Sequence, residues 1–280
     1  MKTIQQTFFK NMGCSLKEKE DQAILFLKEN ESSAITFNPD GYWLAFSGGK
    51  DSIVIKKLAQ LAGVKHHAVY NQTTIDPPEL IHFIKKFHSD VEWERPKKNF
   101  FVEMQTHGLP NRIVRWCCEL YKERGGENHW KIIGVRAAES ARRRALWKPL
   151  TPNRSGNGGM RVCPILYWED IEVWNFIKKY NLPYCSLYDE GFKRIGCVGC
   201  PMAGKNRIKE FKRWPRFEKA YRIAASKYID TRKGKKKRNG EDYYVSRFKN
   251  GNDWFDWWMS DNPSSAERKD ECLGLFDDSI

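Results

Sequence analysis

The sequence predicts an α/β fold, a doubly wound parallel sheet followed by a smaller C-terminal region rich in cysteine, lysine and arginine. Two observations predict the sheet. Short apolar runs alternate with helix-like segments over most of the chain, which is typical of parallel strands joined by helices. A glycine-containing turn also joins the first apolar run to an amphipathic segment, as at a strand-to-helix junction. The alternation stops after Pro183, and this sets the C-terminal region apart.

The first elements follow from local patterns. A helix is expected over residues 17–37, and a short buried strand over 42–46. From Ile53 to Leu61 the apolar residues leave the lysines mostly on another face, so this segment is expected to be a helix, with Gly63 as its stop.

The later elements are assigned in the same way. Strands are expected over 64–70 and 129–135, and helices over 79–88 and 168–180. Residues 151–160 form a Gly- and Asn-rich loop, and an irregular segment is expected after Pro183. The turns that follow the strands, SGGKDS, NQTTIDPPE and RAAESARR, are expected to meet in one cleft, because ligands bind beyond the carboxyl ends of parallel strands.

The turn SGGKDS has the residue types of a phosphate site, and it spans residues 47–52. Two glycines can adopt positive φ and let the backbone approach a ligand, and the start of the next helix offers unpaired N–H groups. The lysine adds a positive charge, and the aspartate fits if Mg²⁺ sits between it and the phosphates. The alternative is an ordinary turn whose Ser and Asp cap a helix. The expected nucleotide-binding residues are Ser47, Gly48, Gly49, Lys50, Asp51 and Ser52.

The turn is not a Walker A loop, because its two glycines are adjacent. SGGKDS instead resembles the PP-loop signature of ATP pyrophosphatases, and the wider chain resembles the phosphoadenylylsulfate (PAPS) reductase family. The resemblance implies a Rossmann-like domain of the adenine nucleotide alpha hydrolase type. It also implies cleavage of ATP between its α and β phosphates, with adenylation of an acceptor. The expected parts are an N-terminal helical segment (1–40), a PP-loop domain (41–190) and a C-terminal CxxC and basic region (191–280).

Composition indicates where the protein is located and what its cysteines do. It has 280 residues, 40% of them apolar, without a run of 18 apolar residues. The N-terminus lacks the pattern of a signal peptide, so a cytoplasmic location without membrane contact is expected. Structural disulfides are rare in that compartment, and eight cysteines therefore invite a metal or redox explanation.

Two cysteine pairs form a candidate metal site. Cys117 and Cys118 are adjacent, and Cys197 and Cys200 form a CxxC motif. Four thiolates from two separated pairs suit either Zn²⁺ or a [4Fe–4S] cluster, and spacing alone leaves both open. The order CC…CxxC resembles the cluster motif of adenylylsulfate reductases, and that resemblance favours the cluster over zinc.

Two departures from those reductases affect the expected chemistry. The chain keeps Lys50 and Asp51 in its PP-loop, which favours ATP as the substrate. The reductases end in a catalytic cysteine motif, whereas this chain reads ECLGLF, with Cys272 as a divergent nucleophile or an ordinary tail cysteine.

The net charge of +14 is concentrated in one segment. Residues 203–250 contain 17 Lys/Arg and 5 Asp/Glu, with aromatic residues among them. The segment is either a solvated basic surface or a contact surface for a nucleic-acid backbone. The interleaved aromatic residues could stack on bases, although Phe217 and Tyr221 fit a core better.

Together these features predict an ATP pyrophosphatase that adenylates an acceptor for sulfur incorporation, as in DNA phosphorothioation systems. Lys50 and Asp51 would be catalytic together with Arg136, which would neutralise charge on the phosphoryl group, with Arg142 or Arg143 as further candidates. Nucleic acid (DNA or tRNA) is the expected partner, and a cysteine desulfurase is a candidate sulfur donor. The alternatives are a PAPS or adenylylsulfate reductase that releases sulfite with Cys272 as nucleophile, and a non-catalytic nucleic-acid-binding module.

Overall fold

The computed structural model of the chain describes residues 14–153, 158–237 and 239–260. The chain forms two compact units, each built from stretches that are separate in the sequence. Unit 1 comprises Met1–Asn71, Pro78–Glu94 and Arg124–Ile195, and unit 2 comprises Gln72–Pro77, Arg95–Glu123 and Gly196–Ile280. The division at residues 40 and 190 expected from the sequence stays a prediction.

Unit 1 contains a six-stranded sheet in the order β3-β2-β1-β4-β6-β5. The strands are β1 (Tyr42–Phe46), β2 (His66–Asn71), β3 (Glu92–Glu94), β4 (Trp130–Ile132), β5 (Leu150–Pro152) and β6 (Met160–Val162). Neighbouring strands pair in parallel except β5 and β6, which are antiparallel. The predicted α/β fold with a parallel sheet is therefore confirmed.

The central strand β1 is the most buried part of the sheet. Tyr42, Leu44 and Phe46 are at most 3% exposed, as expected for a strand covered on both faces. In the pairing register Phe46 lies opposite Tyr70 of β2, and Leu44 lies opposite Ile132 of β4. The order of strands reverses between β1 and β4, because β2 and β3 follow β1 on one side and β4 starts the other. A reversal of this kind opens a ligand-binding crevice beyond the carboxyl ends of the strands.

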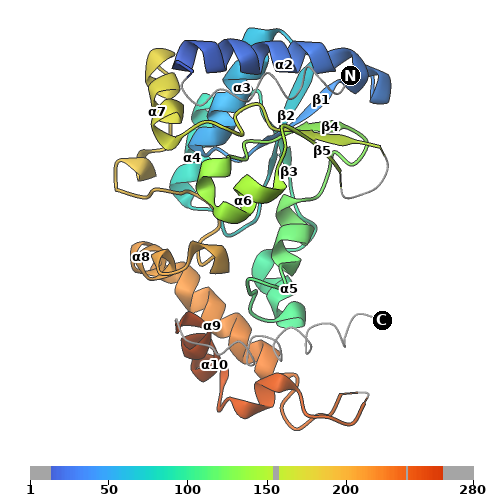
Figure 1. Cartoon of the computed structure of the whole chain (residues 1–280). Coiled ribbons are helices and arrows are strands. Elements are labelled where there is room, and N and C mark those ends of the chain that lie inside the picture. Colours follow the sequence, from blue (N-terminus) through green and yellow to red (C-terminus); the bar gives the residue numbers. More distant parts are fainter. Residues whose placement is uncertain (1–13, 154–157, 238, 261–280) are drawn as a thin grey trace. The chain divides into compact units, whose positions relative to one another are not determined.

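Helices flank the sheet of unit 1. They are α2 (Leu16–Phe37), α3 (Lys50–Ala62), α4 (Pro78–Phe87), α6 (Ala141–Leu146) and α7 (Asp170–Lys179). A capping box between Ser15 and Glu18 starts α2, and Gly63, with φ +66°, ends α3 as predicted. Helix α3 packs against β1, α2 and α7 (Figure 1).

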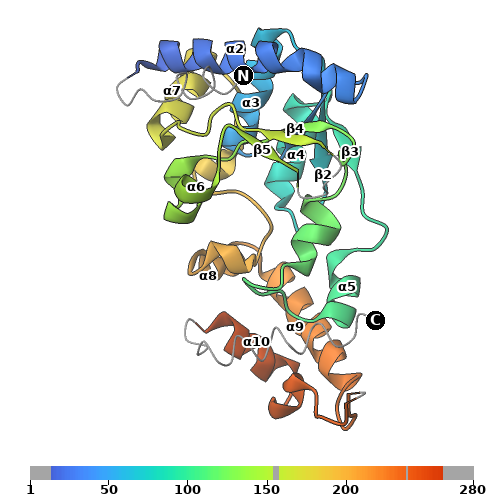
Figure 2. The same cartoon turned by 45° about the vertical axis from the view of Figure 1, so that its right-hand side comes forward.

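Unit 2 is mainly helical, with α5 (Phe100–His107), α8 (Asn206–Arg213), α9 (Pro215–Asp230) and α10 (Gly251–Met259). Helices α5 and α10 both pack against α9 (Figure 2). The rings of Phe100, Phe255 and Trp258 surround Tyr221, and their centroids lie 5.3–6.3 Å from it. The aromatic residues of this region therefore form its core.

Several sequence-based boundaries were wrong. The segment after Pro183 is not irregular throughout, because residues 206–230 and 251–259 are helical. In the sequence, the many basic residues of α9 make its apolar face hard to recognise; this face contains Tyr221, Ala225 and Tyr228. Residues 151–160 are not wholly a loop, since β5 and β6 include both ends of that range. Within the described residues, no helix has the length and hydrophobicity needed to cross a membrane.

Candidate functional site

The turn between β1 and α3 has the backbone of a ligand-binding loop. Gly48 has φ +71°, and a Cβ atom there would lie 2.6 Å from Leu80 Cδ1 and 2.9 Å from Ile84 Cδ1. Both conformation and space therefore require glycine at this position. Gly49 has φ −80°, so the expectation of positive φ is correct for Gly48 and wrong for Gly49. Helix α3 starts at Lys50, three residues before the predicted Ile53.

The two serines of the turn stabilise the loop from within. The Ser52 hydroxyl donates to the Gly49 carbonyl at 2.8 Å, and the hydroxyls of Ser47 and Ser52 are 3.2 Å apart. The N-cap residue of α3 is Gly49, which has no side chain that could accept a hydrogen bond from the first amides of the helix. The first amide of the helix, that of Lys50, instead donates to the Tyr188 hydroxyl at 2.9 Å. An N–H group that suits a phosphate oxygen is thus paired with a neutral hydroxyl.

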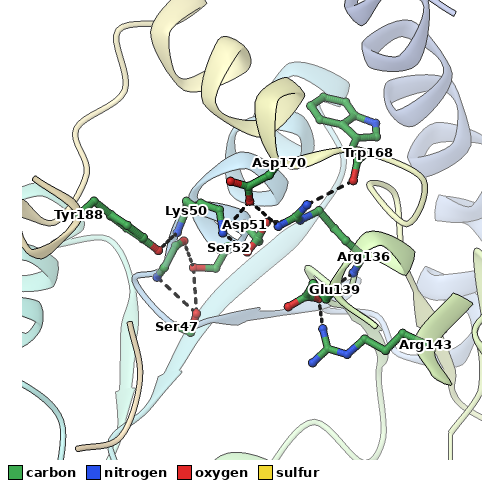
Figure 3. Close-up of polar contacts among 11 residues, drawn as sticks. Ser47, Lys50, Asp51, Ser52, Arg136, Glu139, Arg143, Trp168, Asp170 and Tyr188 are labelled. Carbon is green, nitrogen blue, oxygen red and sulfur yellow. Dashed lines mark hydrogen bonds and ion pairs between the residues drawn. The ribbon is translucent and has the colours of Figure 1, made fainter. Parts of the chain in front are cut away.

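Four charged side chains meet at the N-terminus of α3 (Figure 3). Arg136 Nε donates to Asp51 Oδ1 at 2.6 Å, and Arg136 Nη2 donates to Asp170 Oδ1 at 2.9 Å. Lys50 Nζ lies 3.2 Å from the same oxygen of Asp170 and 3.5 Å from Asp51 Oδ2. Two cations and two carboxylates therefore alternate around one position beyond the ends of β1 and β4.

Arg136 is the most enclosed member of the group, at 3% exposed. Its third donor, Nη1, reaches the Trp168 carbonyl at 3.3 Å, so the guanidinium is held in one orientation. The close approach to α3 of the segment between β4 and Arg136 depends on Gly134, where a Cβ atom would lie 3.1 Å from the Asp51 Cβ. Arg136 therefore offers a fixed positive charge beside the PP-loop.

The carboxyl of Asp170 is kept ionised by its neighbours. Burial tends to raise the pKa of Asp170, but the charges and hydrogen bonds of Lys50 and Arg136 outweigh burial and hold that pKa below its ordinary value. With its side chain 62% exposed, Asp170 is the most exposed of the four charged groups.

The structure brings together Lys50, Asp51 and Arg136, as predicted, and adds three groups that the sequence analysis missed. Asp170 was the easiest to find, because it is an acidic residue at the start of a helix. The sequence gives no signal for the Trp168 carbonyl or the Tyr188 hydroxyl. The NQTTIDPPE turn is divided, since residues 72–77 belong to unit 2, and its convergence with the other turns stays a prediction.

Carboxylate oxygens are the donors that Mg²⁺ prefers, and the donor set of the PP-loop fits this ion. Asp51 Oδ1 accepts from Arg136 at 2.6 Å, whereas Oδ2 lies 3.5 Å from its nearest cation. Asp51 would hold the ion through Oδ2, and Asp170, whose Oδ1 lies 3.2 Å from Lys50 Nζ, is the second carboxylate beside the loop.

The four predicted cysteine ligands all belong to unit 2. Cys117 precedes a short π-helix, Cys118–Lys122, a rare geometry that is frequent at functional sites. The CxxC turn is anchored by two hydrogen bonds to the Val198 backbone: Val198 N donates to the Ile75 carbonyl at 2.8 Å, and the Val198 carbonyl accepts from the Tyr221 hydroxyl at 3.0 Å.

The thiols of the two pairs interact electrostatically. A hydrogen bond with Cys118, together with burial, raises the pKa of Cys117, and the charges of Cys197 and Cys200 add to this rise. The pKa of Cys118 is lowered by the hydrogen bond from Cys117 and by Arg115, although burial opposes the shift. Across residues 14–153, 158–237 and 239–260, no three His, Cys, Asp or Glu side chains form a group that could hold a metal ion. The donor types of the four cysteines fit a thiolate-ligated centre.

Aromatic residues of the basic segment are mostly unavailable to nucleic acid. Trp214 and Tyr228 are at most 7% exposed, so the expectation that they stack on bases was wrong, whereas Tyr221 lies in the core as expected. Arg232 lies over the ring of Tyr228 at 3.7 Å, and Arg247 lies over that of Tyr244 at 4.0 Å. Cation–π stacking therefore occupies faces that a base would need. Cys272 lies outside the described residues.

Comparison with known proteins gives one family match. Residues 41–203 match the model of the phosphoadenosine phosphosulfate reductase domain. The chain is 32% identical over 203 residues to the uncharacterized protein MJ0066 of Methanocaldococcus jannaschii, a match that covers 66% of this chain and 42% of that protein. It is 39% identical over 152 residues to an adenosine 5'-phosphosulfate reductase of Staphylococcus haemolyticus, covering 50% of this chain and 61% of the reductase. The chain thus spans less than two thirds of the length of these relatives.

Among solved structures, the phosphoadenylyl-sulfate (PAPS) reductase of Candida auris, a phosphate complex, is similar with a TM-score of 0.46 and 16% identity. That match covers 67% of this chain and 97% of the Candida auris chain.

Proposed function

The chain belongs to the phosphoadenosine phosphosulfate reductase family, and from this premise we propose that it is an ATP pyrophosphatase that adenylates an acceptor for sulfur incorporation. The observation that carries the proposal is the cluster of Lys50, Asp51 and Arg136 at the N-terminus of α3. A substrate with β and γ phosphates needs these cations, whereas one that ends at a sulfate has less use for the complete SGGKDS loop.

The proposed reaction is a displacement at the α-phosphorus of ATP. An oxygen of the acceptor attacks that phosphorus, the bond to the bridging oxygen breaks, and pyrophosphate leaves with the electron pair. The acceptor then carries AMP, which is a good leaving group when a sulfide or persulfide donor later attacks. Lys50, Arg136 and the amides at the start of α3 would oppose the negative charge that grows on the departing pyrophosphate.

Two resident groups would complete the enzyme. Mg²⁺ supplies charge neutralisation on the phosphates when bound, and Asp51 would hold it. A [4Fe–4S] cluster, with zinc as the alternative, would be held by Cys117, Cys118, Cys197 and Cys200. Support for this second assignment comes from the thiol donor set of unit 2 and its neighbouring cations, Arg115 and Lys122.

The acceptor is proposed to be nucleic acid, in a reaction like DNA phosphorothioation or tRNA thiolation. The charge of +14 supports a polyanionic partner. A cysteine desulfurase is the proposed type of sulfur donor: the outer sulfur of its persulfide attacks the adenylated atom, AMP leaves, and a thiol reductant then cleaves the S–S bond so that one sulfur stays on the acceptor.

A second candidate is favoured by one specific observation, the 39% identity to an adenosine 5'-phosphosulfate reductase. In this reading a thiolate, with Cys272 as the candidate, attacks the sulfur of adenylylsulfate, AMP leaves, and a thiol reductant then releases sulfite.

The two functions differ in their products. Protein purified without oxygen would be incubated with ATP and Mg²⁺, with and without DNA or tRNA, and pyrophosphate would be measured. A parallel sample would receive adenosine 5'-phosphosulfate and a thiol, and sulfite would be measured. Pyrophosphate without sulfite is the expected result, and sulfite without pyrophosphate would refute the proposal.

A further inference from the structure

Helix α6 follows the nucleotide site in the chain and carries charges that the site does not use. Residues 137–168 contain six Lys/Arg residues and one acidic residue, Glu139. Three of the basic residues, Arg142, Arg143 and Arg144, are consecutive on α6. Successive residues of a helix point about 100° apart, so the three guanidinium groups cannot all serve the same ligand atom.

One of the three arginines connects α6 to the site. Arg143 forms an ion pair with Glu139, and the Glu139 carboxylate also accepts from the Arg136 amide at 3.1 Å (Figure 3). Arg136 in turn binds Asp51 and Asp170. A short chain of contacts therefore fixes the start of α6 relative to Lys50, and all of these residues belong to unit 1.

The other two arginines have no such role. Arg142 and Arg144 are exposed, and neither side chain forms a hydrogen bond or ion pair with a residue that the structure describes. No residue of α6 is buried, and Leu146 is 64% exposed. Core packing therefore gives no reason for this sequence, and the acidic residue nearest to α6, Glu139, is paired with Arg143. A polyanion would supply the missing counter-charge.

We propose that α6 is the docking element for the acceptor, and that Arg142 and Arg144 contact the phosphodiester backbone of a nucleic acid. The inference rests on the proposed adenylation of a nucleic-acid acceptor. In such a reaction the attacking oxygen must come within about 3–3.5 Å of the α-phosphorus. A cationic helix connected to Arg136 through Glu139 is placed to hold the backbone beside the PP-loop. Arg143 acts as a positioning residue, since its charge is committed to Glu139.

The test compares Arg142→Gln/Arg144→Gln with a matched control, Lys28→Gln/Lys178→Gln. The control removes two exposed charges from the same unit, on α2 and α7. Three quantities would be measured: binding of labelled duplex DNA and of tRNA without nucleotide at several salt concentrations, binding of ATP, and pyrophosphate release as a function of acceptor concentration.

In the α6 variant, the log–log salt dependence of duplex binding should flatten by about 1.8, which is 0.9 for each lost contact. The acceptor concentration for half-maximal pyrophosphate release should rise about tenfold or more, while ATP binding and the control variant stay as in wild type. The DNA and tRNA titrations identify the acceptor as the polymer whose binding changes.

Acceptor binding that equals wild type would overturn the proposal. So would an equal loss of ATP binding, because α6 would then serve the nucleotide. If the wild type binds nucleic acid with the expected difference between variants but releases no pyrophosphate, the proposed function fails and the docking surface stands. If the wild type turns over ATP and the α6 variant uses the acceptor equally well, the docking surface fails and the function stands.

Discussion

Replacing Lys50 by methionine should abolish most ATP binding while the fold survives. Lys50 is 6% exposed at the start of α3, so an alanine would remove packing as well as charge. Methionine keeps a stem of similar length and removes only the ammonium group. The substitution therefore isolates the electrostatic role of the residue.

The loss of folding stability should be small. The closest ion-pair partner of Lys50 is Asp170, and its side chain is 62% exposed to solvent. Pairs of this kind typically contribute about 0.2–1 kcal/mol. Arg136 also stays bound to both carboxylates, so neither is left without a cation. We expect the free energy of unfolding to fall by about 1 kcal/mol or less.

The cost to ATP binding should be larger, because a contact between an ammonium group and a phosphate is a charge-assisted hydrogen bond. Such bonds contribute about 1.5–3 kcal/mol, which corresponds to a loss of about 10- to 150-fold in affinity. Calorimetric titration with ATP measures the affinity, and urea unfolding measures the stability.

A matched control is Lys178→Met, which removes an exposed lysine of α7 in the same unit. The double variant Lys50→Met/Asp170→Asn should recover stability without recovering ATP affinity. If Lys50→Met bound ATP and released pyrophosphate as well as wild type, the assignment of SGGKDS as a phosphate loop would be refuted.

Three further predictions test other parts of the molecule. Protein purified anaerobically should absorb broadly near ~400 nm, and Cys197→Ser should lose that absorbance; a colourless protein with one stoichiometric zinc would instead identify a tetrahedral site. Neutralising residues 235–238 should flatten the salt dependence of duplex DNA binding by about 0.9 per lost contact and leave ATP hydrolysis without nucleic acid little changed; wild type that binds neither DNA nor tRNA at low salt would contradict this, unless a partner supplies the contact. Burial and the Lys56 charge lower the pKa of His88 to about 4 from 6.5, so the unfolded chain takes up a proton below 6.5 and the folded chain does not. The free energy of unfolding of wild type should therefore fall by about 2 kcal/mol between pH 7 and pH 5, and urea titrations of His88→Gln should lack that part of the decrease.

The sequence by itself determined the local elements of the PP-loop. The apolar run 42–46, the glycine turn and the amphipathic segment that ends at Gly63 were all recognisable, because strand burial, positive φ and helix termination depend on residues close in the chain. The requirement for glycine at Gly48 followed from the same local chemistry, whereas Gly49 shows that a glycine can also adopt ordinary φ. Arg136 was predicted because it follows a strand, and its contact with Asp51 agrees with that reasoning.

Only the tertiary structure decided which groups complete the site and which charges remain free. Asp170 and Tyr188 reach Lys50 across 120 and 138 positions of the chain, and no periodic pattern connects residues so far apart. Their meeting depends on the strand order β3-β2-β1-β4-β6-β5, which is fixed by the packing of the whole sheet. Burial has the same origin: it placed aromatic residues of α9 in a core and left Arg142 and Arg144 of α6 exposed, although both segments are basic.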